Sequence, residues 1–550
     1  MTVVLDAPQA QQIDAVHRTG PASSFVGLRH LLRLALRRDR LRVVLWVTGL
    51  VGVVVATVES ITGLYSTPAQ LEQYARIVRG NTALTVQAGP GYGLDDPTLG
   101  AVMMNELAVW MVIAVALMNI FVVVRHTRTE ETTENAELTR AAPVGRYAGT
   151  AAALLCALIS TVTVATGVAL VLAMSGLPGA GTMAFAMSLV GAGSVFASLT
   201  AVMSQIAATP RSALALGGVA LVASFVARAV GDIGDGRLSW SSPIGWAQAI
   251  RAFADERWWV LVIPVGTSAL LILAAVALQA HRDFGAGILT QRAGRPTAPP
   301  TLGSPLGLSV RLQRASIVAW SVGLGLMGFF YGVVGEQAES IFEENPELES
   351  YFAHLGDASI TDAFLATSVL MMALLAMGLT VSSVLRLRNE EVGFRADLVL
   401  ATPTSRSNWW SSHLAVTSVG MTVALASMGA ATGIGFAALT GEEARIAQLS
   451  AAALLMVPAQ LVVTGIVFCV VAWWPRWSML AWGVVAAIVV VDLFGTLLEL
   501  PQWVMNVSPF QHVPAVPAVS FQAAPIVILL ACSAVLAAVG AIGLRRRDIG

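Results

Sequence analysis

The chain has 550 residues, of which 56% are hydrophobic and 12% are charged, and its net charge is −1. A soluble protein carries roughly twice that charged fraction, and apolar runs of about 20 residues recur here, long enough to cross a bilayer as helices. Lysine is absent, so all 32 basic residues are arginine. This excludes a phosphate-binding loop of the GxxxxGK[ST] type, which requires lysine. The composition predicts an all-α polytopic membrane protein that does not hydrolyse ATP in that way.

Residues 1–40 are predicted to form a cytoplasmic N-terminal segment with an amphipathic helix from Ala22 to Arg40. Arginines recur along one face of this helix, and apolar residues cover much of the remainder. Such a helix can lie in the headgroup layer with its apolar side down. It can equally be a cytosolic extension of the first membrane span, and the sequence leaves both interpretations open.

Twelve membrane spans are predicted to follow, six in a first half (41–285) and six in a second half (315–550). The predicted spans are 41–63, 100–124, 147–174, 182–207, 212–231 and 259–280, then 315–335, 361–385, 408–438, 447–473, 477–498 and 524–544. A linker rich in Gly, Pro and Thr, 286–314, joins the halves. With the N-terminus inside, 25 of the 32 arginines fall in cytoplasmic segments. This bias predicts cytoplasmic N- and C-termini in the cell membrane.

A polar motif follows the second predicted span of each half. Residues 125–146 and 386–406 align without a gap at an offset of 260, and nine of the 19 positions from Arg128 to Arg146 are identical or closely similar. The matched pairs are Arg128/Arg388, Glu130/Glu390, Glu131/Glu391, Ala136/Ala396, Glu137/Asp397, Leu138/Leu398, Ala141/Ala401, Pro143/Pro403 and Arg146/Arg406. Two solvated loops that merely connect spans are the alternative interpretation. Such loops need not share acids, a proline and a terminal arginine, so we favour a shared function.

The halves also match at two other places. Ser242-Pro243 corresponds to Ser508-Pro509, and the HRDFG that follows the sixth span (281–285) corresponds to RRDIG at 546–550. Two six-span halves that both begin in the cytoplasm form a parallel repeat, related by a pseudo-twofold axis along the membrane normal.

Two segments on the predicted outer face stand out. Residues 336–360 are acidic and contain no arginine, which is typical of a solvated face but could also concentrate cations. Residues 232–258 combine charges with aromatic residues, a pattern that suits a short interfacial or re-entrant helix.

Few residues within the predicted spans could carry chemistry. Carboxylates inside a membrane are candidate functional groups, and Glu59, Glu106 and Asp492 are the best placed, although solvation at the interface is the alternative. Methionines cluster on the second span of each half, where flexible thioethers suit an adaptable transport pathway, with core filling as the alternative. Those we select are Met103, Met111, Met371 and Met372. No metal-ligand spacing is found, and the cysteines, Cys156, Cys469 and Cys532, are interpreted as packing residues.

The two halves, each with an acidic motif ending in A-x-P-x-x-R after its second span, resemble the ABC-2 type permeases of actinobacterial drug exporters. The most similar group is the polyketide-antibiotic (tetronasin-type) exporters, which includes mycobacterial multidrug efflux permeases, and the resemblance covers nearly the whole chain from about residue 25. It implies a type V exporter fold and a permease subunit that exports hydrophobic or amphipathic drugs, antibiotics or lipids. It also implies no enzymatic activity and no cofactor in this chain, since two copies of a separate ABC ATPase bind ATP and Mg. No nucleic acid partner is expected.

In such permeases the loop after the second span forms a coupling helix that docks into the ATPase. The resemblance places coupling helices at 128–143 and 388–403. The matching residues are Arg128, Glu130, Glu131, Glu134, Glu137, Arg140, Pro143 and Arg146 in the first copy, and Arg388, Glu390, Glu391, Arg395, Asp397, Pro403 and Arg406 in the second. Gly393 and Phe394 stand where the first copy has Thr133 and Glu134, so the two docking surfaces need not be equivalent.

Simple physical rules agree with this assignment. Acids near the start of a short helix interact favourably with its positive end, and each motif proline restricts the residue before it and so ends the helix. As solvated loop groups, Glu130, Glu131, Glu390 and Glu391 are expected to contribute little to stability.

A proton-coupled secondary drug transporter with twelve helices is the alternative function, because parallel six-span halves also describe that class. Deep protonatable residues would favour it, and this chain has few. A membrane enzyme or scaffold that handles lipids would need paired polar residues on facing spans, and none is evident in the sequence.

Overall fold

In the computed structural model, residues 24–133, 142–282, 285, 287–289, 296–336, 359–495 and 500–547 are described. Within these ranges the chain forms helices and connecting segments, with no β-strand. The chain divides into two compact units, Met1–Ala293 and Gly294–Gly550, and each is considered by itself.

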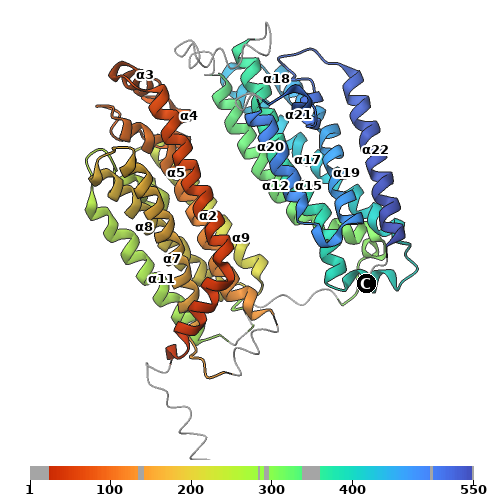
Figure 1. Cartoon of the computed structure of the whole chain (residues 1–550), viewed down its shortest axis with the longest axis horizontal. Coiled ribbons are helices and arrows are strands. Elements are labelled where there is room, and N and C mark those ends of the chain that lie inside the picture. Colours follow the sequence, from red (N-terminus) through yellow and green to blue (C-terminus); the bar gives the residue numbers. More distant parts are fainter. Residues whose placement is uncertain are drawn as a thin grey trace, which may run out of the picture. The chain divides into compact units, whose positions relative to one another are not determined.

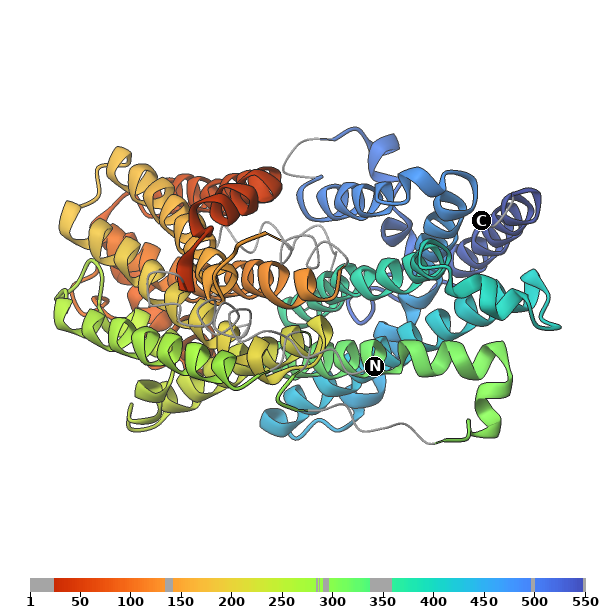
Figure 2. The same cartoon turned by 90° about the horizontal axis from the view of Figure 1, so that it is seen from below.

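The first unit is a bundle of long helices (Figures 1 and 2). These are α2 (Leu28–Leu64), α5 (Leu99–Val124), α7 (Ala148–Met174), α8 (Gly179–Ile206), α9 (Pro210–Ile233) and α11 (Val262–Ala280). Helix α8 packs against α5, α7 and α11, and α5 also contacts α2 and α9. Helices α5 and α8 are the most buried of the six, because both are apolar around much of their circumference.

Helix α2 runs unbroken for 37 residues and includes much of the predicted N-terminal amphipathic helix. At 1.5 Å per residue it is about 55 Å long, whereas the hydrocarbon core is about 30 Å thick. The structure therefore favours an extension of the first span over a separate helix that lies flat in the headgroup layer.

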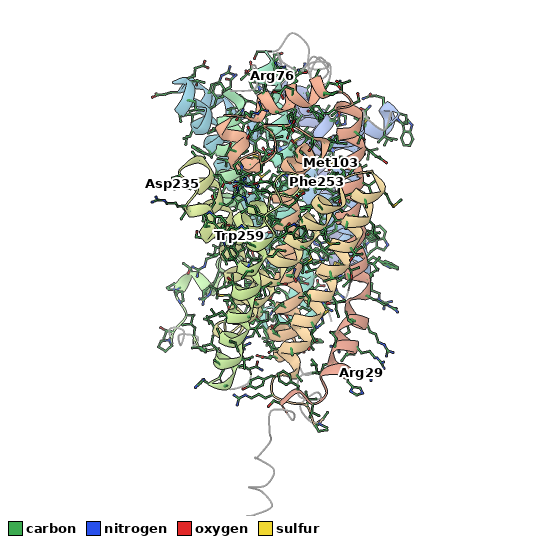
Figure 3. All side chains as sticks on the ribbon, turned by 90° about the vertical axis from the view of Figure 1, so that its left-hand side faces the viewer. Arg29, Arg76, Met103, Asp235, Phe253 and Trp259 are labelled. Carbon is green, nitrogen blue, oxygen red and sulfur yellow. The ribbon has the colours of Figure 1, made fainter. Side chains whose placement is uncertain are left out.

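One end of the first unit is covered by short helices. These are α3 (Pro68–Val78), α4 (Thr82–Ala88), η3 (Leu238–Ser241), α10 (Pro243–Ala249) and η4 (Trp258–Leu261). The segment predicted as one interfacial helix, 232–258, thus contains several short turns. Phe253 in this segment has φ 62°, and its ring lies against Gly100 and Gly181, where an added Cβ would clash with it. Figure 3 shows Arg29 and Arg76 at opposite ends of the unit.

The second unit is also a helical bundle. Its helices are α12 (Pro305–Glu336), α15 (Ile360–Val392), α16 (Arg395–Leu400), α17 (Arg406–Thr440), α18 (Ala444–Leu455), α19 (Val457–Trp473), α20 (Leu480–Phe494), α21 (Gln502–Met505) and α22 (Ala523–Arg546), with η5 (Pro300–Gly303), η7 (Pro475–Trp477) and η8 (Pro509–His512). Helices α12 and α17 approach closely because both carry glycine at their contact. A Cβ on Gly332 would lie 2.0 Å from the Thr432 carbonyl oxygen, and one on Gly435 would lie 2.2 Å from that of Phe329. Small residues at such contacts are typical of membrane helix pairs.

Eleven helices in the described ranges are long and apolar enough to cross a membrane, and each overlaps a predicted span. Of the twelve predicted spans, 477–498 contains no such helix among the described residues. Helix α20 in this segment has only 15 residues, about 22 Å of helix. Helix α12 begins at Pro305, well before the predicted start at 315 and inside the predicted linker. The predicted acidic segment 336–360 lies almost entirely outside the described residues.

Candidate functional site

The first copy of the repeated motif continues the membrane helix before it. A π-helical turn, η2 (Arg125–Thr129), follows α5, and the helix ends after Glu131. The predicted coupling helix 128–143 therefore begins as the end of this span. Glu134, Glu137 and Arg140 lie outside the described residues, and Pro143 lies in the non-helical segment before α7.

In the second copy, α15 extends through Glu390 and Glu391 and stops at Val392. Gly393 ends the helix, Phe394 takes a left-handed conformation with φ 54°, and the six-residue helix α16 follows. The predicted coupling helix 388–403 therefore covers the last turn of α15, the break at Gly393 and Phe394, and α16. The motif is the end of one span followed by a short separate helix, and Pro403 lies in the turn before α17.

The second acid of each copy is held between two arginines. Arg128 Nη1 donates to Glu131 Oε2 at 2.7 Å, and Arg282 Nη1 donates to the same oxygen at 2.9 Å. We call Arg128, Glu131 and Arg282 the first clasp. The Glu131 side chain is only 13% exposed. The first clasp therefore joins the end of α5 to the chain that leaves α11.

An equivalent arrangement occurs in the second unit. Arg388 Nη1 donates to Glu391 Oε2 at 3.0 Å, and Arg547 Nη2 donates to Glu391 Oε1. Arg388, Glu391 and Arg547 form the second clasp, in which the Glu391 side chain is 4% exposed. Burial lowers the pKa of the Arg547 guanidinium, and the neighbouring Glu391 carboxylate opposes that change. Each clasp thus holds a carboxylate with little solvent exposure inside a single unit.

The terminal arginine of each copy makes a second link to the last helix of its unit. Arg146 Nη2 donates to the carbonyl oxygens of Gln279 and Ala280, at 2.8 and 2.9 Å, and so satisfies the C-terminal end of α11. Arg406 Nη1 donates to the Arg547 carbonyl oxygen at 3.1 Å. The matched arginines therefore serve matched structural roles.

The first acids of the two copies differ in their surroundings. Glu130 is half-exposed, with its side chain 42% exposed, and lies 3.4 Å from Arg38 and 3.2 Å from His126 Nδ1. Glu390 is only 11% exposed and accepts from Arg395 at 2.9 Å. That hydrogen bond raises the pKa of the Arg395 guanidinium. Glu130 therefore remains accessible to a partner, whereas Glu390 orients the start of α16.

Exposed apolar side chains surround the short helix of the second copy. Val392, Phe394 and Leu398 are each well over half exposed, while Ala396 is buried against α15. Asp397 and Arg395 are exposed on the same helix. The segment therefore presents an apolar surface with charges beside it, at the end of a long helix.

A charge network that the sequence did not reveal joins α2 to the start of the first motif copy. Asp39 is buried, its Oδ1 lies 3.0 Å from both Arg42 Nη1 and Arg125 Nε, and its Oδ2 lies 2.6 Å from His126 Nε2. Cys156 also lies close, so three potential metal ligands come within 4.8 Å of one another. Because two guanidiniums already neutralise the carboxylate, we assign no metal to this group.

In the second unit Arg386 stands at the position of His126 and donates to the backbone of α12 at Leu312.

The predicted pathway residues are distributed unevenly. Glu59 and Glu106 are exposed on α2 and α5, and Asp492 on α20 accepts from Ser508 and Gln511. Met103, Met111 and Met372 are fully buried in the cores of their units, which matches the core-filling alternative, whereas Met371 is partly exposed.

Arg282 and Arg547 were indicated in the sequence only by the match between HRDFG and RRDIG. No pattern indicated Asp39 and His126.

These features define a multi-pass helical membrane protein whose two units carry the same motif at a helix end. A family described as "Multidrug efflux system permease Rv1217c, C-terminal domain" matches residues 302–545. The chain is also 36% identical over 553 residues to the multidrug efflux system permease protein Rv1217c of Mycobacterium tuberculosis (strain ATCC 25618 / H37Rv), across 100% of this chain and 99% of that protein. The chain belongs to this family of multidrug efflux permeases.

Proposed function

We propose that the chain is the permease subunit of an ATP-driven exporter of the ABC-2, tetronasin-type class, which moves hydrophobic or amphipathic drugs, antibiotics or lipids out of the cell. Full-length similarity to a multidrug efflux permease supports transport. The proposal includes twelve spans in two parallel repeats, with α20 as a short span, and cytoplasmic termini in the cell membrane.

The exposed apolar surface of α16 is the observation that carries the ATPase partnership. Val392, Phe394 and Leu398 project where a soluble partner can reach them, and exposed apolar patches with charged neighbours suit protein docking. We propose that two ABC ATPase subunits, which bind ATP and Mg, dock at this segment and at the first motif copy. Glu130 and Asp397 would contact them, as would Glu134, Glu137 and Arg140.

In this proposal the two clasps stabilise the docking segments and do not contact the ATPase. Glu391 is buried, Glu131 is largely buried, and both are paired, so they cannot offer their charge to a partner without breaking both ion pairs. They instead join each docking segment to the last helix of its unit. With Arg146 and Arg406, they make the docking segment rigid, so that motion of an ATPase is transmitted to the membrane helices.

We expect Phe394→Ala combined with Leu398→Ala to reduce co-purification of the ATPase at least about tenfold, because central apolar anchors dominate docking energies. The measurement is pull-down of a co-expressed ABC ATPase partner, at matched permease abundance. Phe521→Ala is the matched control, an exposed aromatic residue outside the motif. Undiminished co-purification with the double variant would contradict docking at α16.

We expect the motif end of each unit to face the cytoplasm. In a background lacking Cys156, Cys469 and Cys532, Arg76→Cys should react with an impermeant thiol reagent added to intact cells, and Arg29→Cys and Leu398→Cys should not. Arg29 and Arg76 lie at opposite ends of the first unit (Figure 3). Labelling of Arg29→Cys or Leu398→Cys from outside, in cells shown to be sealed, would invert this topology.

The buried Asp39–His126 pair favours one alternative, a proton-coupled secondary transporter. An aspartate and a histidine here form a buried ionisable pair that joins two helices of the first unit. The docking experiment separates the two functions, because a secondary transporter needs no ATPase. Absence of any ATPase in complexes purified with the wild-type chain would favour the proton-coupled alternative.

A further inference from the structure

An open groove lies between α2, α3 and α5, toward the end of the first unit where Arg76 lies (Figure 3). Its volume is about 450 Å³, which is within the range of pockets that hold drug-sized molecules. The wall from α2 is mostly apolar, with Thr57 and Ser60 as its hydroxyl groups. The opposite side is formed by Tyr65, Tyr74 and the Glu106 carboxylate. One acidic group therefore lies among aromatic and apolar surfaces.

The carboxylate of Glu106 is held in place by neutral donors. Asn105 Nδ2 donates to the Tyr74 hydroxyl oxygen at 2.8 Å, and the Tyr74 hydroxyl donates to Glu106 Oε1 at 2.6 Å. Burial raises the pKa of Tyr74, as does the charge of Glu106, so the hydroxyl keeps its proton and remains a donor. This chain of hydrogen bonds positions one carboxylate oxygen. The other oxygen, Oε2, has no hydrogen-bond partner in the described part of the chain.

In its charge balance Glu106 differs from Asp39, Glu131 and Asp232, three buried or partly buried helix acids of the first unit, and resembles the exposed Glu59. Asp39, Glu131 and Asp232 each pair with at least one arginine. Within the residues that the structure describes, no arginine or histidine forms an ion pair with Glu106. A carboxylate beside apolar helix surface is costly without a counter-charge. The groove is therefore complementary to a positively charged ligand.

The aromatic rings specify which kind of cation fits. Tyr65 and Tyr74 meet edge to face, with ring centroids 5.2 Å apart, beside the carboxylate. Aromatic rings attract organic cations through their electron-rich faces, and the apolar wall from α2 can accept hydrocarbon. A hard metal ion would instead require about six oxygen ligands, and the groove offers one carboxylate and a few hydroxyl groups.

We infer that this groove binds amphiphilic organic cations, with the charged centre at Glu106 and Tyr74 and the hydrocarbon part against α2. The inference rests on the proposed export function, because it names the class of cargo. Glu106 and Tyr74 supply the charge selectivity, and Asn105 is a positioning residue that orients the Tyr74 hydroxyl.

The test uses two ions of the same shape and opposite charge, tetraphenylphosphonium and tetraphenylborate. Binding of each is measured to the purified full-length chain in nanodiscs of zwitterionic lipid, without ATPase or ATP. The wild-type chain should bind the phosphonium cation more tightly than the borate anion after subtraction of empty nanodiscs. Glu106→Gln should weaken phosphonium binding about fivefold, because it removes the charge that attracts the cation and leaves the tyrosine rings in place.

Two further variants make the result decisive. Glu72→Gln removes an exposed acid from α3 that already pairs with Arg79, and it should leave phosphonium binding unchanged. Glu106→Asp keeps the charge and should stay within about threefold of wild type, as expected if charge and not side-chain shape sets affinity. No phosphonium binding by the wild type, or equal affinity in Glu106→Gln, would overturn the inference.

This experiment is independent of the ATPase partnership. If phosphonium binding depends on Glu106 but no ATPase co-purifies, the cation groove stands and the ATP-driven function fails. If an ATPase docks at α16 but Glu106→Gln binds phosphonium as the wild type does, the export proposal stands and the cation groove is refuted.

Discussion

Glu391→Gln is expected to lower the thermal unfolding temperature of the purified chain by at least about 6 °C and to reduce its abundance in the membrane. Glu391 is buried between Arg388 and Arg547, so its neutralisation leaves two guanidiniums facing each other without a counter-charge. Removal of one partner from a buried ion pair costs about 3–5 kcal/mol. The measurement is unfolding in detergent, followed by tryptophan fluorescence.

The matched control is Glu443→Gln, since Glu443 is exposed in the segment between α17 and α18. It should leave the unfolding temperature within about 1 °C, as is usual for surface substitutions. Combining Glu391→Gln with Arg547→Gln should recover part of the loss, because the second change removes one unpaired charge. Wild-type stability in Glu391→Gln would show that the second clasp does not hold the unit together. Glu131→Gln should also lower the unfolding temperature, because it removes the carboxylate that Arg128 and Arg282 share.

Asp39→Asn is expected to loosen the first unit while leaving the second unchanged. Asp39 balances Arg42, Arg125 and the His126 ring where α2 meets α5. With an amide in its place, these groups lose their shared negative charge, at a cost of about 3 kcal/mol. Hydrogen exchange of the full chain in nanodiscs measures the effect. Amides near Asp39 and His126 should exchange at least about tenfold faster, and those of α12 and α17 should not change.

Asp95→Asn is the control for this prediction. Asp95 is fully exposed, and its ion pair with Arg79 Nε is long, at 3.9 Å. It should leave exchange in α2 and α5 as in the wild type. The matched second-unit position differs in its contact, because Arg386 donates there to the Leu312 backbone carbonyl. Equal acceleration in both units, or none in α2, would contradict a local role for the network.

The solvent exposure of the motif glutamates differs from what the sequence predicts. Glu130, Glu131, Glu390 and Glu391 were expected to be solvated and to matter little for stability. Glu130 fits the first part of that expectation, since it is half-exposed. Glu131, Glu390 and Glu391 do not fit it. For Glu131 and Glu391, one of the two arginine partners lies 151 or 156 residues further along the chain. The match between HRDFG and RRDIG identified these arginines as equivalent but said nothing about what they contact.

The sequence alone determined the features that depend on local composition. Apolar runs long enough to cross a bilayer located the eleven long helices, because a helix in hydrocarbon must satisfy its backbone internally and hide few charges. The gapless repeat located the motif, and the missing lysine excluded one nucleotide site. These signals lie within short windows of residues, so no knowledge of packing was needed.

The tertiary structure alone decided which charges are buried and what they contact. The Asp39–His126 pair joins residues 87 positions apart, and the Tyr74–Glu106 hydrogen bond joins residues 32 apart. Nothing in either local sequence specifies the other member, because each contact depends on how whole helices lie against one another. For the same reason the break at Gly393 and Phe394, which exposes α16, could not be inferred from the motif alone. Burial and pairing are properties of the packed bundle, and they separate the acids that hold this protein together from those that can reach a partner.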